Sequence, residues 1–201
     1  TSGTAGADNG FFSTMWKNLY EGVHRANDAI ANLSEVGGGG VDEETRLRLL
    51  SESKFLRAYY YMRLNELYGR YGLGVPIYTE PLASVEDCTK GQSPESEVWD
   101  LIVQDLTDCI NEPNLPGKYA QGNSSYGRIT KGAAYAFRGY TYQFMGDYAK
   151  ALADFEAIEG LGYALYSPSN GVKGNRDFFQ LFKPANEQCD EMIFSVQCVE
   201  T

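Results

Sequence analysis

The sequence predicts a mainly α-helical fold of antiparallel helical hairpins, with long irregular loops and one short strand near the C-terminus. Apolar residues recur with a helical period in five segments, and one segment near the end alternates apolar and other residues as a strand does. The last two helical segments are separated only by Gly146, so they must fold back on each other. A chain of 201 residues can bury a sizeable core in one domain, and we expect a single helical-repeat region over residues 1–201.

The first expected helix begins at a capping Ser13, after a glycine-rich polar loop, and continues to about Leu33. Asn27 is the one polar member of its apolar stripe, and a buried amide needs hydrogen-bond partners, so we expect a structural role for it. His24 is the only histidine, and no neighbouring residue completes a catalytic pair with it. The stripe consists of Trp16, Leu19, Tyr20, Val23, Asn27 and Ile30.

The second expected helix is the central element of the fold. Asp42 can cap its start, after a flexible link of four glycines at 37–40. The run from Phe55 to Tyr68 is apolar on most of the helix circumference, which indicates a helix packed between other elements. We expect Gly69 to end it in a left-handed conformation and Pro76 to prevent it from resuming.

Arg57 places a charge inside this apolar run. An unpaired buried guanidinium is costly, so we expect it to contact a carboxylate, with Asp28 and Asp105 as candidates, or backbone carbonyls. The alternative is that its aliphatic stem packs in the core while the charged head reaches water.

The third expected helix starts at Ser93-Pro94-Glu95, with the serine as cap and the proline in the first turn, and continues to about Asn111. Its buried side is expected to contain Val98 or Trp99, together with Ile102, Leu106 and Cys109.

The last two expected helices, Thr130–Met145 and Asp147–Glu159, carry a recognisable spacing of small and aromatic residues. Small residues allow close contact between paired helices, and aromatic rings fill the remaining space. The pattern resembles one tetratricopeptide repeat, with Arg138 and Ile158 as departures where an apolar and a small residue are usual. The residues concerned are the small Gly139, Gly146 and Ala151 and the aromatic Tyr135, Tyr142, Tyr148 and Phe155.

The remainder of the chain is expected to be irregular apart from one strand. Residues 160–182 contain several glycines, a proline and aromatic side chains. The segment Met192–Gln197 alternates well enough to predict a short strand.

Composition excludes some functions. The net charge of −10 argues against nucleic-acid binding, which depends on cationic neutralisation of phosphates. No run approaches the roughly 20 apolar residues that span a bilayer. The four cysteines have no metal-ligand spacing and their disulfide pairing stays open, although Cys109 fits a buried free thiol; they are Cys88, Cys109, Cys189 and Cys198. We expect no metal site, cofactor or catalytic residue.

Several segments in order resemble the SusD/RagB family: LYEGVHRANDAIANL, ESKFLRAYYYMRLNELYGRYGLGVPIY, SEVWDLIVQDL, GRITKGAAYAFRGYTYQFMGDYAKALADFEAIE and EMIFSVQ. The resemblance implies a tetratricopeptide-like scaffold and a lipoprotein of the outer membrane at the cell surface. It also implies binding of glycans, or sometimes peptides, without catalysis, and a SusC-like TonB-dependent transporter as partner. We expect further chain at both ends, including the lipid anchor that would be the protein's only attachment to the membrane.

A candidate glycan-binding stretch lies at the start of the first helix. Sugars bind to exposed aromatic faces flanked by amide and carboxylate groups, and the stretch ADNGFFSTMW has this composition. The alternative is a hydrophobic staple, in which Phe12 packs back on the helix, and Trp16 fits a core position better than an exposed one. The candidates are Asp8, Asn9, Phe11, Phe12 and Trp16.

Two other functions remain open. The chain could be a helical-repeat scaffold that binds proteins or peptides, or an enzyme whose catalytic residues lie in further chain. An exposed aromatic surface outside the helix grooves would favour glycan binding over the scaffold.

Overall fold

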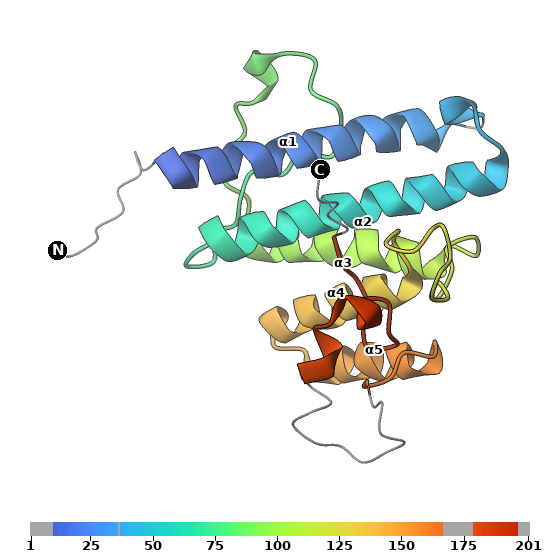
Figure 1. The fold of residues 1–201 in the computed structure, drawn as a ribbon. Coiled ribbons are helices and arrows are strands. Elements are labelled where there is room, and N and C mark those ends of the chain that lie inside the picture. The colour runs from blue at the N-terminus through green and yellow to red at the C-terminus, as the bar shows by residue number, and fades with distance from the viewer. Residues whose placement is uncertain (1–9, 36, 167–178, 197–201) are drawn as a thin grey trace. The chain divides into compact units, whose positions relative to one another are not determined.

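The structure is a computed structural model that describes residues 10–35, 37–166 and 179–196. All five predicted helices are present, in the predicted order (Figure 1). The chain divides into two compact units, residues 1–114 and 115–201, and each is described by itself. The single helical-repeat region expected from the sequence stays a prediction.

The first unit contains three long helices, with α2 (Glu43–Tyr68) packed against both α1 (Gly10–Ser34) and α3 (Glu95–Asn111). Figure 1 shows α1 and α2 antiparallel, joined through the short 3-10 helix η1 (Gly38–Gly40). The central position predicted for α2 is confirmed, and its fully buried side chains include Phe55, Ala58, Tyr61 and Leu64.

Asp42 caps α2 as predicted, accepting a hydrogen bond from the Thr45 backbone amide at 2.9 Å. The prediction for Gly69 is wrong, because it ends the helix with φ −69° and ψ 135°. Glycine is needed there because the backbone of residue 69 lies close to Asn65, and a Cβ would lie only 2.5 Å from the Asn65 carbonyl oxygen. The left-handed residues follow at Tyr71 and Gly72.

Two helix starts differ from the prediction. Helix α1 begins at Gly10 rather than after Ser13, so Phe11 and Phe12 belong to its first turn. The Tyr68 hydroxyl of α2 donates to the Phe12 carbonyl at 2.8 Å and ties this extra turn to the neighbouring helix. Pro94, not Ser93, occupies the capping position of α3, because Ser93 instead bonds through its backbone to residues 74 and 75.

The second unit contains the predicted hairpin, α4 (Lys131–Met145) and α5 (Tyr148–Gly160). Gly146 turns the chain with φ 76°, a left-handed conformation that suits glycine. Gly139 and Ala151 are buried where the helices meet, and a Cβ on Gly139 would lie 2.7 Å from the Phe155 ring. The structure thus places both small residues as the tetratricopeptide spacing requires.

The strand predicted at Met192–Gln197 is absent from residues 192–196, the part of it that the structure describes. A strand needs a partner for its backbone hydrogen bonds, and Phe194 instead packs its ring edge-to-face on Phe137 of α4, with centroids 5.8 Å apart. Residues 179–181, expected to be irregular, are helical.

Candidate functional site

The first turn of α1 presents two aromatic rings to solvent. Phe11 is 67% and Phe12 43% exposed, and their rings meet edge-to-face at 5.7 Å. Two adjacent phenylalanine rings exposed together form a small apolar patch at the surface. Of the other predicted glycan-binding residues, Asp8 and Asn9 lie outside the described residues.

Trp16 connects this exposed pair to the interior. It is half-buried, and its ring packs against Tyr20 at 4.8 Å and edge-to-face against Tyr68 at 4.9 Å. Trp16 therefore packs between rings of α1 and α2, which fits a core position better than an exposed one. The staple alternative requires Phe12 to precede the helix cap, and Phe12 instead lies inside α1. We call Phe11, Phe12, Trp16 and Tyr68 the aromatic end of the first unit.

A buried polar network fixes the three helices of this unit. Arg57 of α2 is 7% exposed and forms a two-pronged pair with Asp105 of α3, with Nε–Oδ2 at 2.8 Å and Nη2–Oδ1 at 2.7 Å. Its remaining nitrogen, Nη1, donates to the Asn27 side-chain oxygen at 3.0 Å and to the Thr79 carbonyl at 3.1 Å. Asp105, one of the two carboxylates considered from the sequence, is thus the partner.

The same network holds the chain that follows α2. The Asn27 amide donates to the Tyr78 carbonyl at 2.9 Å, and the Tyr20 hydroxyl donates to the Pro76 carbonyl at 2.8 Å. Burial acts to lower the pKa of Arg57, but the hydrogen bonds and the charge of Asp105 outweigh it and raise that pKa. The guanidinium therefore stays charged. The hydrogen bonds to the backbone carbonyls of this segment hold residues 76–79 in place although they form no regular secondary structure.

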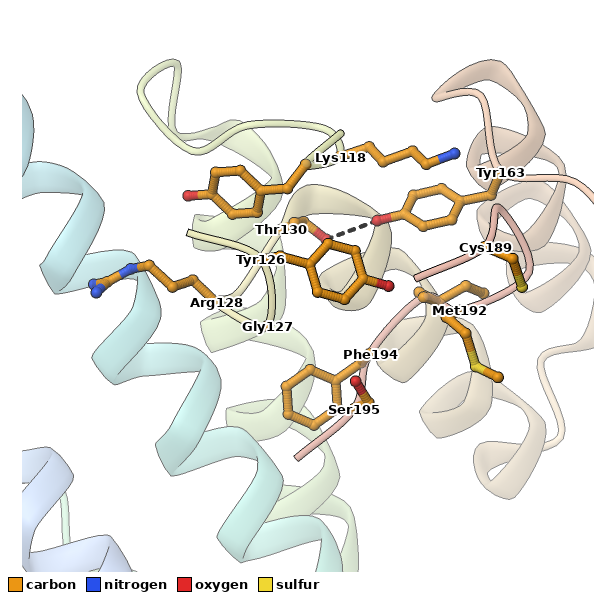
Figure 2. Close-up of a pocket in the computed structure, with 12 residues that line it drawn as sticks. Lys118, Tyr126, Gly127, Arg128, Thr130, Tyr163, Cys189, Met192, Phe194 and Ser195 are labelled. Atoms are coloured by element: carbon orange, nitrogen blue, oxygen red, sulfur yellow. Dashed lines mark hydrogen bonds between the residues drawn. The ribbon is translucent and has the colours of Figure 1, made fainter. Parts of the chain in front are cut away.

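The second unit contains a pocket that is lined by the loop before α4 and by the chain after α5 (Figure 2). The Tyr163 hydroxyl lies 3.1 Å from the Thr130 hydroxyl, which also caps α4. The Lys118 ammonium donates to the Gly162 carbonyl and to Asp190, and it lies 4.8 Å from the centre of the Tyr163 ring. The lining consists of Lys118, Tyr119, Tyr126, Gly127, Arg128, Thr130, Tyr163, Cys189, Met192, Ile193, Phe194 and Ser195.

This pocket is too small to be a glycan-binding site. Its volume is about 20 Å³, enough for little more than one water molecule. A sugar ring does not fit, and Lys118 already has its partners within the fold. Burial raises the pKa of Tyr163, which keeps its hydroxyl neutral and able to bond with Thr130. We therefore interpret the pocket as structural packing.

No cluster of metal-ligating side chains occurs in the described part of the chain, and no helix among the described residues is long and apolar enough to cross a membrane. Of the cysteines in the described ranges, Cys88, Cys109 and Cys189 are unpaired. Cys109 is fully buried, as predicted, and burial raises the pKa of its thiol.

Comparison with known proteins now gives the family. The SusD-like family, described as starch-binding and associating with the outer membrane, matches residues 4–143. The chain belongs to this family. It is 27% identical over 184 residues to the SusD-like protein P25 of Formosa agariphila, which covers 92% of this chain and 32% of that protein.

Solved SusD-like structures share the helical fold. A SusD-like protein from Bacteroides fragilis is 27% identical with a TM-score of 0.78, covering 98% of this chain and 35% of its own. A laminarin-binding SusD-like protein is 31% identical with a TM-score of 0.64, covering 76% of this chain and 32% of its own. Surface glycan-binding protein A from Bacteroides uniformis is 27% identical with a TM-score of 0.69, covering 90% and 37%. The chain thus spans about a third of the length of these relatives.

The sequence could not identify every residue of interest. The apolar run that ends at Tyr68 does not predict that the Tyr68 hydroxyl contacts the first turn of α1. Tyr71 is 86% exposed, and no periodicity or motif in the sequence indicates a role for it. The only signal was its place between the end of a helix and Gly72, in a loop with no periodicity.

Proposed function

We propose that this protein binds glycans at the surface of the outer membrane, without catalysis, and works with a SusC-like TonB-dependent transporter in nutrient uptake. The observation that carries the proposal is the family match over residues 4–143. The names of the similar proteins, which bind laminarin or surface glycans, support the same class of ligand.

The aromatic end of the first unit is the proposed glycan-binding surface. Exposed phenylalanine rings offer apolar faces to the C–H surfaces of a sugar, and the neighbouring Asp8 and Asn9 would supply polar groups for its hydroxyls. The hydrogen bond from the Tyr68 hydroxyl to the Phe12 carbonyl holds this turn against α2, which lowers the entropic cost of binding. Affinity should nonetheless be weak, because a few ring contacts must offset desolvation of many hydroxyls.

The test is Phe11→Ala and Phe12→Ala in the full-length protein, with calorimetric titration of starch and laminarin oligosaccharides. We expect a loss of affinity of about tenfold for the pair, since each ring contact contributes about 0.5–1.5 kcal/mol. Phe179→Ala is the matched control, because Phe179 is 71% exposed but lies in the second unit.

Circular dichroism separates the alternatives. Lost binding with an unchanged spectrum supports the proposed surface. Unchanged binding would place the site elsewhere, and a lost fold would show that the two rings are needed for packing. Binding of a peptide but of no glycan would favour the scaffold function instead.

A further inference from the structure

A tight turn follows α2 at the same end of the first unit as the aromatic end. The Arg70 amide donates to the Leu73 carbonyl at 2.7 Å, and the Leu73 amide donates to the Arg70 carbonyl at 3.1 Å. Tyr71 and Gly72, between them, have φ of 56° and 79°. Positive φ at both central residues defines a type I′ turn, in which asparagine, aspartate and glycine are favoured.

Tyr71 is an unexpected residue for this position. It is the only residue other than glycine with positive φ in the part of the chain that the structure describes. A bulky side chain in the left-handed region is strained, and such strain persists where the side chain has a use. The fold gains little from the ring by burial, because Tyr71 is 86% exposed.

The ring is nevertheless held in a defined orientation. The Arg70 guanidinium carbon lies 4.5 Å from the centre of the Tyr71 ring, and its Nη2 donates to the Tyr71 hydroxyl at 2.7 Å. Arginine stacks well on aromatic rings and keeps further donors for other acceptors. Both side chains are exposed, so the ring and these donors are accessible together.

The turn lies beside the surface already proposed. Figure 1 shows the start of α1 and the end of α2 at the same end of the antiparallel pair. The Tyr68 hydroxyl, three residues before Tyr71, reaches the Phe12 carbonyl at 2.8 Å. Residues from two separate segments thus bring aromatic side chains to one end of the unit.

We propose that Tyr71 is a sugar-stacking residue, with Arg70 as the residue that orients its ring and donates to sugar hydroxyls. This inference rests on the proposed glycan-binding function and adds a second segment to its surface. The C–H face of a sugar packs on the accessible ring, and the guanidinium donors meet the hydroxyls at the edge of the same sugar. A ring already oriented by Arg70 loses little freedom on binding.

The test uses Tyr71→Asn in the full-length protein, because asparagine suits the left-handed backbone and removes the ring. We expect affinity for the bound glycan to fall about tenfold, the effect of losing one good ring contact. The melting temperature should be unchanged or higher, since backbone strain is relieved. Tyr71→Phe keeps the ring and should keep most of the affinity.

Tyr148→Ala is the matched control, because Tyr148 is 70% exposed on α5 of the second unit. Glycan binding by the wild type with unchanged affinity in Tyr71→Asn would overturn this inference alone. A lower melting temperature for Tyr71→Asn, or an equal loss of affinity in Tyr148→Ala, would overturn it as well. A wild type that binds no glycan would overturn the proposed function, and this inference with it.

Discussion

Arg57 lies within the most apolar part of α2, where a charge would be costly without partners. Its guanidinium uses Nε and Nη2 on Asp105 and Nη1 on Asn27 and the Thr79 carbonyl. One side chain therefore links three helices and the loop after α2. The need for a partner could be predicted from the sequence because burial and charge conflict there, whereas the choice between Asp28 and Asp105 required the helix packing.

Arg57→Met tests the energetic role of this network. The substitution removes one partner and leaves Asp105 buried without its counter-charge, so the free energy of unfolding should fall by about 3–5 kcal/mol. Urea denaturation followed by circular dichroism measures this change. Arg25→Met is the control, because the Arg25–Glu21 pair is exposed and should contribute less than about 1 kcal/mol.

The double variant Arg57→Met with Asp105→Leu sharpens the test. Replacing both charges by apolar groups removes the stranded carboxylate, so much of the lost stability should return. Equal destabilisation by the single and double variants would contradict this account and point to lost packing at Arg57. A single variant as stable as the wild type would show that water reaches Asp105.

At the scale of elements, the α4–α5 hairpin follows the tetratricopeptide spacing and shows why its departures are tolerated. Arg138 occupies a position where an apolar residue is usual, and it pairs with Asp154 of α5 through Nε–Oδ2 at 2.8 Å and Nη2–Oδ1 at 2.7 Å. A charge pair between the helices thus replaces an apolar contact. Ile158, the other departure, is buried at 7% exposure.

Gly139→Ala tests the close approach of these two helices. The added Cβ would lie 2.7 Å from the Phe155 ring, so the ring or the helix must move. Overpacking costs about 1–3 kcal/mol, against up to about 1 kcal/mol gained from better helix propensity, and we expect a net loss of stability. Differential scanning calorimetry measures the shift.

Gly160→Ala is the control for this substitution. A Cβ at Gly160 meets nothing within 4 Å, so this variant should be neutral or slightly more stable than the wild type. If both glycine variants gain stability equally, the hairpin does not depend on close contact at Gly139.

Local sequence signals predicted the elements better than their ends. All five predicted helices form, because their apolar periodicity is a local signal. Of the predicted caps, Asp42 caps α2, whereas Ser13 lies inside α1 and Pro94 takes the capping position predicted for Ser93. The start of α1 and the missing strand depended on contacts with distant residues, Tyr68 and Phe137, which periodicity does not contain.

At the scale of the whole molecule, the sequence could place Phe11 and Phe12 in a candidate site but not Tyr71. Two adjacent phenylalanines beside an acid and an amide form a compositional signal, whereas Tyr71 is distinguished by its backbone conformation and exposure. Helix packing brings the start of α1 and the end of α2 together, although these segments are distant in the sequence.

The proposed partnership with a transporter belongs to the full-length protein, since this chain spans about a third of its relatives. The family description associates these proteins with the outer membrane, while no helix in the described residues can span one. We propose that a lipid anchor and the transporter attach the full-length protein to the outer membrane, and this proposal predicts where the protein is found in cells.

We expect the tagged full-length protein to fractionate with the outer membrane and to copurify, after mild detergent extraction, with a TonB-dependent transporter identified by mass spectrometry. The proposed lipid anchor should hold it in the membrane without the transporter, because each CH₂ group of an acyl chain buried in the bilayer contributes about 0.8 kcal/mol. Deleting the transporter gene should therefore leave the protein in the membrane fraction and abolish glycan uptake. Recovery of the protein in the soluble fraction after cell lysis would contradict the anchor. If no transporter copurifies from wild-type membranes, the partnership is contradicted, and glycan binding is still decided by the tests at Phe11, Phe12 and Tyr71.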